Sequence, residues 1–348
     1  MDYKVTEESF ASLASYWAEP RNNLNWSSIF VLPTWMQVWW LAFGSRAELR
    51  LYAVQQGEKI VGIAPLLIRK AIASIVGNND VCDYLDFVVV PGKEDDFFTT
   101  VLNYLRQKGI TQLDLKQLRP DSTVFTNLLP VARRRKYKTL CHQEDVSLAL
   151  DLPSNWNEYL RILTPKQRHE VERKLRRLQQ AGKVEYQLIE DNAAVPEVMD
   201  IFFKLFRKSS PEKASFMTSQ MESFFRSLAE AMTKIGLLRL GILKLDTLPT
   251  AAVMAFDYKD CVYLYNSSFD PAYRSLSVGL LSKVLLIKDS IRRGRKRFDF
   301  LKGGEIYKYH LGGREISLHS CQITIKITWQ KEGFDGSQPT GNSHTQCT

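Results

Sequence analysis

The chain repeats one order of predicted elements: an antiparallel hairpin, a further strand, a helix and another strand. Alternating apolar residues on both sides of a short polar turn predict each hairpin, and apolar residues at helical spacing predict each helix. The repeated segments are 49–56, 59–68, 95–107 and 113–118 in the first copy, and 237–244, 249–258, 277–293 and 298–301 in the second. This repetition predicts an α/β (α+β) protein with two tandem, duplicated domains, each a mixed, mostly antiparallel sheet flanked by helices.

The length of 348 residues suits two domains of ordinary size. An extended, apolar run over 148–155 ends in Pro-Ser and marks a boundary. We therefore expect one domain at 1–150, the scaffold or acceptor side, and a second at 151–330. The tail 331–348 is rich in Gly, Ser, Thr and Gln, which predicts disorder.

Three further segments carry local expectations. Residues 1–48 have mixed apolar spacing, which indicates helices throughout. Between two predicted helices, 208–213 is polar and contains a proline, which favours a mobile connector or a lid. The segment 316–329 alternates and is predicted to be a closing strand.

Nothing in the sequence indicates secretion, a membrane span or a metal site. The start lacks the basic and apolar pattern of a signal peptide, and no apolar run approaches the ~18 residues that a bilayer requires. We therefore expect a cytoplasmic protein without integral membrane association. The cysteines are odd in number and scattered, so we expect reduced thiols and neither a disulfide nor zinc. They are Cys82, Cys141, Cys261, Cys321 and Cys347.

Positive charge is concentrated in three segments of this chain, whose net charge is +9. Seven basic and two acidic residues lie within 164–183, and shorter basic clusters lie at 133–138 and 292–297. Such clusters attract polyanions, such as tRNA or a phosphate-bearing small molecule. The alternative is that each cluster is an ordinary solvated face.

The richest stretch in polar and aromatic groups is 261–313. It reads as a strand, a helix from Ser277, a short strand at 297–301 and a glycine-punctuated loop at 302–313. Where a strand leads into a helix start, backbone N–H groups are left unpaired and point outward. An anionic group such as a pyrophosphate can bind there.

The residues at the start of this helix resemble a loop motif of a known protein superfamily. Arg274-Ser-Leu-Ser-Val-Gly279 is similar to the R/Q-x-x-G-x-G/A loop with which acetyltransferases of the GNAT superfamily hold the pyrophosphate of coenzyme A. Ser277 stands where the first glycine belongs, and Gly279 keeps its place. The alternative is that Ser277 is an N-cap and Gly279 permits close packing.

A wider set of motifs resembles the BioF2-like or CelD-like acetyltransferases, relatives of the FemABX aminoacyl transferases, which carry two GNAT-like halves. The motifs cover roughly residues 28–325. They are Phe30-Val-Leu-Pro-Thr-Trp35, Val61-Gly-Ile-Ala-Pro-Leu66, Arg168, Tyr265-Asn-Ser-Ser-Phe-Asp-Pro-Ala-Tyr273, Phe298-Asp-Phe300 and Gly304-Glu-Ile-Tyr-Lys308. The resemblance implies tandem GNAT-like domains, with the acyltransferase site in the second.

The resemblance further implies an N-acyltransferase that moves an acyl group from acyl-CoA to an amine of a small molecule or of a cell-envelope or polysaccharide precursor, with no metal and no DNA partner. Backbone N–H groups near Tyr265–Ser267 would stabilise the oxyanion. The implied residues are Arg274, Ser277, Val278, Gly279 and Leu280 for the donor, Asp299, Tyr307 and Lys308 for catalysis, and Arg168, Tyr265, Asn266 and Glu305 for the substrate.

Two other functions stay open on the sequence. A FemABX-like transferase would use aminoacyl-tRNA, bound by the basic segments 164–183 and 133–138. A non-catalytic binding protein would have a decayed donor loop, for which the missing glycine at Ser277 is the sign.

Overall fold

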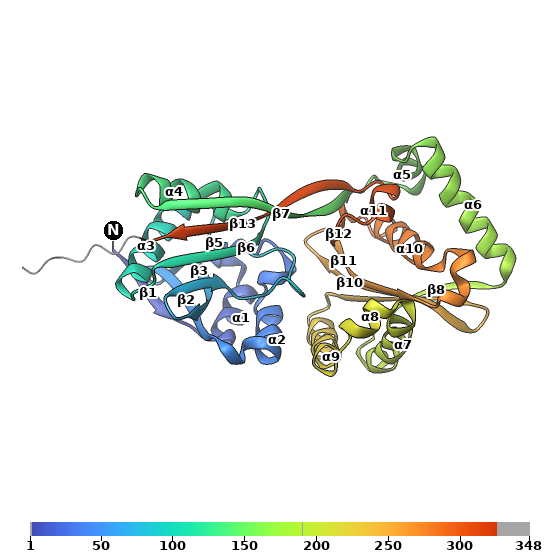
Figure 1. Cartoon of the computed structure of the whole chain (residues 1–348), viewed down its shortest axis with the longest axis horizontal. Helices are drawn as coiled ribbons and strands as arrows, with labels where there is room; N and C mark the ends of the chain where they lie inside the picture. Colours follow the sequence, from blue (N-terminus) through green and yellow to red (C-terminus); the bar gives the residue numbers. More distant parts are fainter. Residues whose placement is uncertain (1, 190, 326–348) are drawn as a thin grey trace, which may run out of the picture.

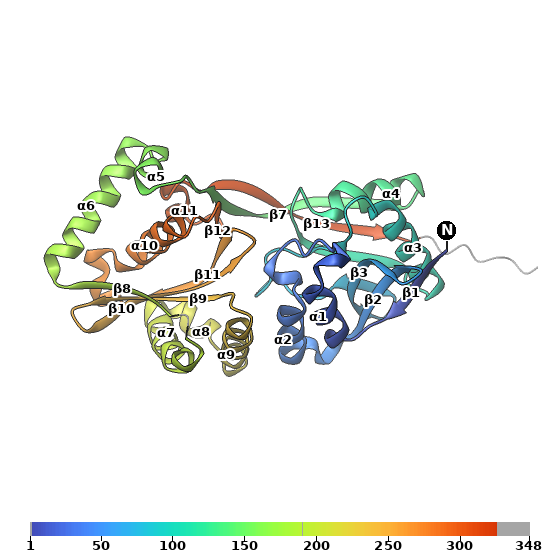
Figure 2. The same ribbon diagram turned by 180° about the vertical axis from the view of Figure 1, so that it is seen from behind.

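The computed structural model describes residues 2–189 and 191–325, which form two halves side by side (Figure 1; Figure 2 gives the view from behind). The strands are β1 (Tyr3–Glu7), β2 (Glu48–Gln56), β3 (Lys59–Arg69), β4 (Ile72–Ile75), β5 (Val88–Val89), β6 (Gln112–Leu118), β7 (Lys138–Asp151), β8 (Val184–Ile189), β9 (Leu238–Leu245), β10 (Leu248–Tyr258), β11 (Cys261–Phe269), β12 (Arg297–Lys302) and β13 (Arg314–Thr324). The α-helices are α1 (Phe10–Ala18), α2 (Pro33–Phe43), α3 (Glu94–Gln107), α4 (Leu129–Arg134), α5 (Trp156–Ile162), α6 (Pro165–Ala181), α7 (Val195–Ser209), α8 (Pro211–Phe216), α9 (Ser219–Lys234), α10 (Val278–Arg292) and α11 (Ile306–His310).

All strands join one sheet, and the order of its strands confirms the predicted duplication. From one edge the order is β1-β2-β3-β4-β6, then β13-β7, then β12-β11-β10-β9-β8, with β5 beside β3. The outer five strands of one half therefore mirror those of the other. Most neighbours are antiparallel, and the parallel pairs are β4 with β6 and β11 with β12. These are the equivalent pairs of the two copies, each bridged by a helix, α3 or α10.

The two central strands are exchanged between the halves. β7 follows the first copy in sequence, yet it pairs with β12 of the second. β13 ends the second copy, yet it pairs with β6 of the first. The two exchanged strands also pair with each other along Lys138–Ala149, and Figure 1 shows them as the bridge between the halves. Each half of the sheet is thus completed by a strand from the other half of the chain.

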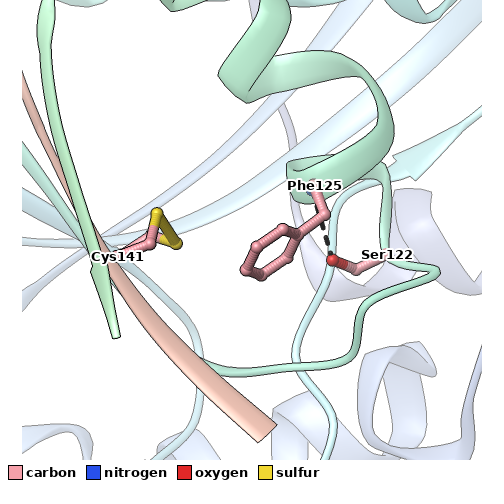
Figure 3. The surroundings of a disulfide bond; sticks show 4 residues. Ser122, Phe125 and Cys141 are labelled. Atoms are coloured by element: carbon pink, nitrogen blue, oxygen red, sulfur yellow. Dashed lines mark hydrogen bonds between the residues drawn. A yellow bond between two sulfur atoms is a disulfide. The ribbon is translucent and has the colours of Figure 1, made fainter. Parts of the chain in front are cut away.

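A disulfide joins the exchanged strands, so the expectation of reduced thiols throughout is wrong. Cys141 and Cys321 are direct partners in the β7–β13 register, with Cα atoms 4.2 Å apart, and their sulfurs are bonded (Figure 3). The pair is separated by 180 residues in sequence. Only the strand exchange brings it together, and local cysteine spacing carries no sign of that. Cys82 and Cys261 are free and buried.

Two local expectations are also wrong. Residues 3–7 are not helical but form β1, because pairing with the edge of β2 supplies backbone partners that the local sequence does not reveal. Residues 211–216 are helical, because Ser210 caps α8 by accepting from the Lys213 N–H and Pro211 occupies the first turn. The predicted tail 331–348, Cys347 and the end of the predicted closing strand lie outside the described residues.

Two tryptophans of α2 are packed in the core: Trp35 is 0% and Trp39 3% exposed. α7 and α9 cover one face of the second-half sheet, and α10 packs on β9, β10 and β11. Within 2–189 and 191–325, every helix is too short or too polar to cross a membrane.

Candidate active site

The site begins where β11 and β12 separate. These parallel strands pair over only three residues each, Cys261–Tyr263 with Arg297–Asp299, and then diverge. On its other side, β11 continues antiparallel to β10 as far as Phe269. The separated ends leave a wedge-shaped opening on the second-half sheet, at the end where β11 leads through a short 3₁₀ turn into α10.

A β-bulge lies on β11 at this opening. Met254 pairs with Asn266 and Ala255 with Leu264, so Tyr265 has no partner residue on β10. A bulge frees backbone groups from the ladder and redirects the side chain. The bulge falls in the segment Tyr265–Ser267, where the sequence predicts oxyanion donors.

The opening leads into a cavity of about 500 Å³, which we call the main cavity. Its walls come from β11, the turn before α10, the start of α10, the end of β12 and α11, with Asp83 from the first half and Lys213 from α8. Ten of the twelve residues predicted from sequence lie in these walls. They are Tyr265, Asn266, Arg274, Ser277, Val278, Gly279, Leu280, Glu305, Tyr307 and Lys308.

The start of α10 faces the main cavity without a side-chain cap. Ser277 occupies the N-cap position but adopts the left-handed conformation, with φ 58°, and its hydroxyl caps no N–H group. Left-handed backbone is a conformation that glycine adopts readily, so a glycine would suit the position that Ser277 occupies. The first N–H groups of α10 are therefore left for a bound anion.

Gly279 has a packing role in addition to its place in the loop. A Cβ atom at Gly279 would lie 2.8 Å from the ring of Phe269 on β11. The absence of a side chain thus lets the helix start approach the strand closely, which is one of the two interpretations that the sequence left open.

Five cationic side chains line the main cavity against two carboxylates, Asp83 and Glu305. Three of the cations, Lys213, Lys283 and Lys302, were not predicted from sequence as site residues. Lys213 and Lys283 belong to helices whose register gave no sign that these positions face a cavity, and Lys302 ends β12. The cationic residues are Lys213, Arg274, Lys283, Lys302 and Lys308.

Lys283 is 7% exposed, and among the described residues no carboxylate forms an ion pair with it. Its Nζ donates to the Gly279 carbonyl at 2.6 Å and lies 4.8 Å from the centre of the Tyr307 ring. Burial, together with the neighbouring Lys213 and Lys308, lowers the pKa of Lys283 to about 7. A neutral amine is therefore present in the cavity near neutral pH.

Lys213 and Lys302 close the cavity from two sides. Lys213 reaches from α8 to donate to the Ser267 carbonyl, and burial lowers its pKa to about 8. Lys302 joins the halves: its N–H donates to Asp83 Oδ2 at 3.0 Å and its Nζ to the Asn79 carbonyl. The segment predicted as a lid or connector thus supplies a wall residue from a helix.

Lys308 is buried and fully engaged. Its Nζ donates to the carbonyls of Leu301 at 3.1 Å, Lys302 at 2.6 Å and Gly303 at 3.0 Å, and it lies 2.8 Å from Glu305 Oε2. Leu301 has φ 60°, an unfavourable backbone conformation for leucine. These contacts indicate that Lys308 holds the strained end of β12 in place.

Tyr265 and Asn266 are also engaged at the opening. The Tyr265 hydroxyl donates to the Val81 carbonyl of the first half at 3.1 Å, and the ring packs edge-on against Trp35. Asn266 Oδ1 accepts from the Ser267 N–H at 3.0 Å. Both side chains therefore shape the opening, and Tyr265 links the two halves.

Asp299 lies apart from the other predicted catalytic residues. It lines a separate cavity of about 350 Å³ between the halves. Its Oδ1 accepts from the Tyr84 hydroxyl at 2.7 Å and from the Leu301 N–H at 2.8 Å, and Arg119 is 3.6 Å from Oδ2. Burial raises the pKa of this carboxyl. Asp299 thus contacts the first half and, through Leu301, the end of β12.

Arg168 also lies apart, on α6, and lines neither of these cavities. The basic segment 164–183 that contains it belongs to α6 at one end of the molecule, whereas 133–138 belongs to the end of α4 at the other (Figures 1 and 2). The two basic segments therefore do not form one continuous surface.

Comparisons with known proteins agree with this geometry. Residues 165–309 match the family model of the acetyltransferase (GNAT) domain. No curated protein matches the sequence.

Solved structures show the fold of the whole chain. FemX is similar over 91% of this chain and 96% of its own, with 11% identity and a TM-score of 0.65. The C-terminal domain of a putative lysylphosphatidylglycerol synthetase from Agrobacterium fabrum is similar over 90% and 92%, with 11% identity and a TM-score of 0.58. A conserved protein of unknown function from Bacteroides thetaiotaomicron covers 93% and 100%, with 10% identity and a TM-score of 0.55. The chain therefore carries a GNAT acetyltransferase domain in its second half, within a duplicated fold that it shares with FemX.

Proposed function

We propose that the chain is an N-acyltransferase of the BioF2-like or CelD-like kind, which moves an acyl group from acyl-CoA to an amine of a small molecule or of a cell-envelope or polysaccharide precursor in the cytoplasm. One observation carries this proposal. The uncapped start of α10 opens into a cavity lined by five basic side chains, of which Lys283 is the one with a pKa lowered to about 7, beside the diverging ends of β11 and β12. A pyrophosphate is the kind of group that such a helix start binds.

In the proposed reaction, the amine nitrogen attacks the thioester carbon, the C–N bond forms and the C–S bond breaks. Arg274 and the segment Ser277–Leu280 hold the pyrophosphate, and backbone N–H groups freed by the bulge at Tyr265 face the developing oxyanion. The amine loses one proton, and the CoA thiolate gains one. Lys283, neutral near pH 7, is suited to accept the proton of the amine.

The residues predicted from sequence to be catalytic receive more specific roles in this proposal. The contacts of Lys308 and Asp299 with the end of β12 support positioning roles for both. The Tyr307 ring packs against the Lys283 amine and helps to exclude water from it. Arg168 is kept as a candidate substrate contact on α6, and Asn266 and Glu305 as candidate contacts within the main cavity.

A charge placed at Ser277 tests the donor. Aspartate and asparagine both tolerate left-handed backbone and have nearly the same shape, so Ser277→Asp and Ser277→Asn differ essentially in one negative charge. We expect acetyl-CoA to bind the wild type and Ser277→Asn in calorimetric titration, and to lose at least about tenfold in affinity for Ser277→Asp, since the carboxylate repels the pyrophosphate. Gly279 is a poorer choice, because any side chain there meets Phe269.

If the folded wild type binds neither acetyl-CoA nor longer acyl-CoAs, the proposed donor is wrong. The alternative is then a FemABX-like transferase that uses aminoacyl-tRNA. That alternative predicts activity that ribonuclease abolishes. The separation of the two basic segments at opposite ends of the molecule disfavours it. A decayed, non-catalytic loop is disfavoured too, because Ser277 adopts the backbone that the missing glycine would supply.

A further inference from the structure

A third cavity lies in the first half, between α2 and the strands β3, β4 and β6. Its volume is about 340 Å³, and we call it the first-half cavity. Trp39 and Phe43 of α2 form an aromatic side, Asn78 and Asp114 contribute polar groups, and the exposed Arg69 and Lys116 also line it. None of these residues is used in the reaction proposed above.

Three polar atoms in the walls of the first-half cavity are sealed from solvent and have no hydrogen-bond partner among the described residues. They are Nε1 of Trp39, Oδ1 of Asn78 and Oδ1 of Asp114. A buried polar group without a partner costs about 1–3 kcal/mol. Such groups are uncommon in native proteins. All three belong to residues that line one cavity, so a polar molecule bound there is a candidate for the missing partners.

The unpartnered atoms define the chemistry of that molecule. The indole N–H of Trp39 requires an acceptor, whereas the oxygens of Asn78 and Asp114 require donors. A phosphate or carboxylate would serve the indole and attract Arg69 and Lys116, but it has no donor for the two oxygens; an ammonium group would serve only the oxygens. A hydroxyl group both donates and accepts. Several hydroxyl groups on one molecule can therefore satisfy all three atoms.

The aromatic side of the cavity favours a ring. Trp39 and Phe43 have ring centres 6.0 Å apart, with their planes inclined by 45°, and both line the cavity, so they offer it an apolar surface. Small-molecule sites combine such apolar walls with a few placed polar groups, and their volumes begin at about 300 Å³. A single sugar ring has both features, C–H groups on its faces and hydroxyl groups at its edge.

The first-half cavity also lies next to the main cavity. The loop after β4 passes between them: Gly77, Asn78 and Asn79 line the first-half cavity, and Asp83 lines the main one. Lys302 of β12 is tied to this loop at both Asn79 and Asp83. One short, anchored segment thus forms part of both walls.

We propose that the first-half cavity binds a carbohydrate ring and thereby holds the acceptor beside the acyl donor. The role as acceptor rests on the proposed function, whereas binding of the sugar does not. The inference gives the first half a function of its own: it recognises the hydroxyl-bearing part of the acceptor.

The test uses glucosamine as the probe and the full chain. Titration by saturation-transfer NMR and calorimetry is expected to show saturable binding to the wild type. Asp114→Asn and Trp39→Phe each remove one required partner and are expected to weaken binding about tenfold or more, which corresponds to the loss of one such bond. Trp40→Phe on the same helix and Asp95→Asn on α3 are matched controls outside the cavity and are expected to bind as the wild type does.

Asn78→Ala is a further variant in a loop, where a lost side chain does not disturb a helix or strand, and it is also expected to weaken binding. Failure of folded wild type to bind glucosamine or N-acetylglucosamine, or unchanged binding in the cavity variants, would overturn the inference. Acetyl-CoA titration of the same samples separates the two proposals. Acetyl-CoA binding without sugar binding contradicts only the inference, and the reverse contradicts only the proposed donor.

Discussion

The two copies of the duplicated fold differ most at the helix that follows their inner strands. In the first half, the first turn of α3 carries Glu94, Asp95 and Asp96. In the second, the first turn of α10 has no acidic residue and faces a cationic cavity. Carboxylates neutralise the partial positive charge of a helix start, whereas an open start attracts anions. One fold thus provides a closed helix start in one copy and a candidate anion site in the other.

The space beside these helices differs in the same sense. After β4 pairs with β6 at Ile72 and Ala73, the following loop packs buried side chains such as Val81 and Phe87 into the first half and leaves the first-half cavity of about 340 Å³. After β11 leaves β12, the second half keeps a larger cavity of about 500 Å³ at the helix start. The duplicated frame is thus the same in both copies, and loop packing sets the size and place of the cavity in each.

The largest expected effect concerns Lys308, which ties the end of β12. After β6 the first half has no such lysine; Arg119 there pairs with Asp121 instead. Lys308→Ala removes hydrogen bonds to three carbonyls, so we expect a loss of about 3 kcal/mol or more in the free energy of unfolding, measured by urea denaturation. Lys116→Ala, an exposed lysine on β6, is the control. If Lys308→Ala unfolds like the wild type but loses acyl transfer, the catalytic role predicted from sequence is supported instead.

The disulfide joins the copies, since Cys141 lies on β7 and Cys321 on β13. Cys141→Ser is expected to lower the free energy of unfolding by about 2–4 kcal/mol, because the bond closes a loop of 180 residues and restricts the unfolded chain. A reductant should produce a similar loss in the wild type and none in the variant. Disulfides persist in oxidising compartments, so thiol titration in fresh lysate also tests the predicted cytoplasmic location. Equal stability of both proteins without reductant would show that the bond contributes nothing.

The sequence predicted the repeated elements well because hairpins, helices and their apolar faces are local properties. It also predicted ten residues that share one cavity, since they lie on β11, on the turn and start of α10, and on or just before α11. The contacts that the sequence did not predict depend on pairing between segments that are far apart in the chain. Cys141 with Cys321, Asp83 with Lys302, and Lys213 with Ser267 meet only because the strands are exchanged and α8 folds over β11. Asp299 is a further example. The sequence predicts the strand that carries it, but not its contact with the Tyr84 hydroxyl, which comes from the other half.

Lys283 gives the next prediction, because the first half has no buried lysine at the start of α3. With a pKa of about 7, its amine becomes neutral as the pH rises through 7, so acyl transfer should increase across that range. Lys283→Met, which keeps the length and burial of the side chain, is expected to reduce kcat about 100-fold and to remove this limb of the pH profile. Retained acetyl-CoA affinity is the control. If Lys283→Met shows the same increase in rate through pH 7 as the wild type, Lys283 is not the proton acceptor.

The same residue affects stability with a definite sign. The folded pKa of Lys283 is lowered, so between pH 7 and about 10 the unfolded chain binds more protons than the folded one. Stability should therefore increase with pH in that window, by at most about 1.4 kcal/mol per pH unit for one group. Urea denaturation of Lys283→Met at pH 7 and pH 9 should show a smaller increase than the wild type, and an equal increase would contradict the assigned burial effect.

The smallest expected effect is at Ser277, where the sequence departs from the R/Q-x-x-G-x-G/A loop that it resembles. Left-handed backbone costs an L-residue about 1–2 kcal/mol, and glycine avoids that cost. Glycine also gives the unfolded chain more freedom, which offsets part of the gain. Ser277→Gly should therefore stabilise the protein by no more than about 1 kcal/mol, measured by thermal unfolding, and should leave acetyl-CoA affinity unchanged. A tenfold gain in affinity would instead show that the serine side chain obstructs the helix start, and the second copy would then be a partly closed version of the first.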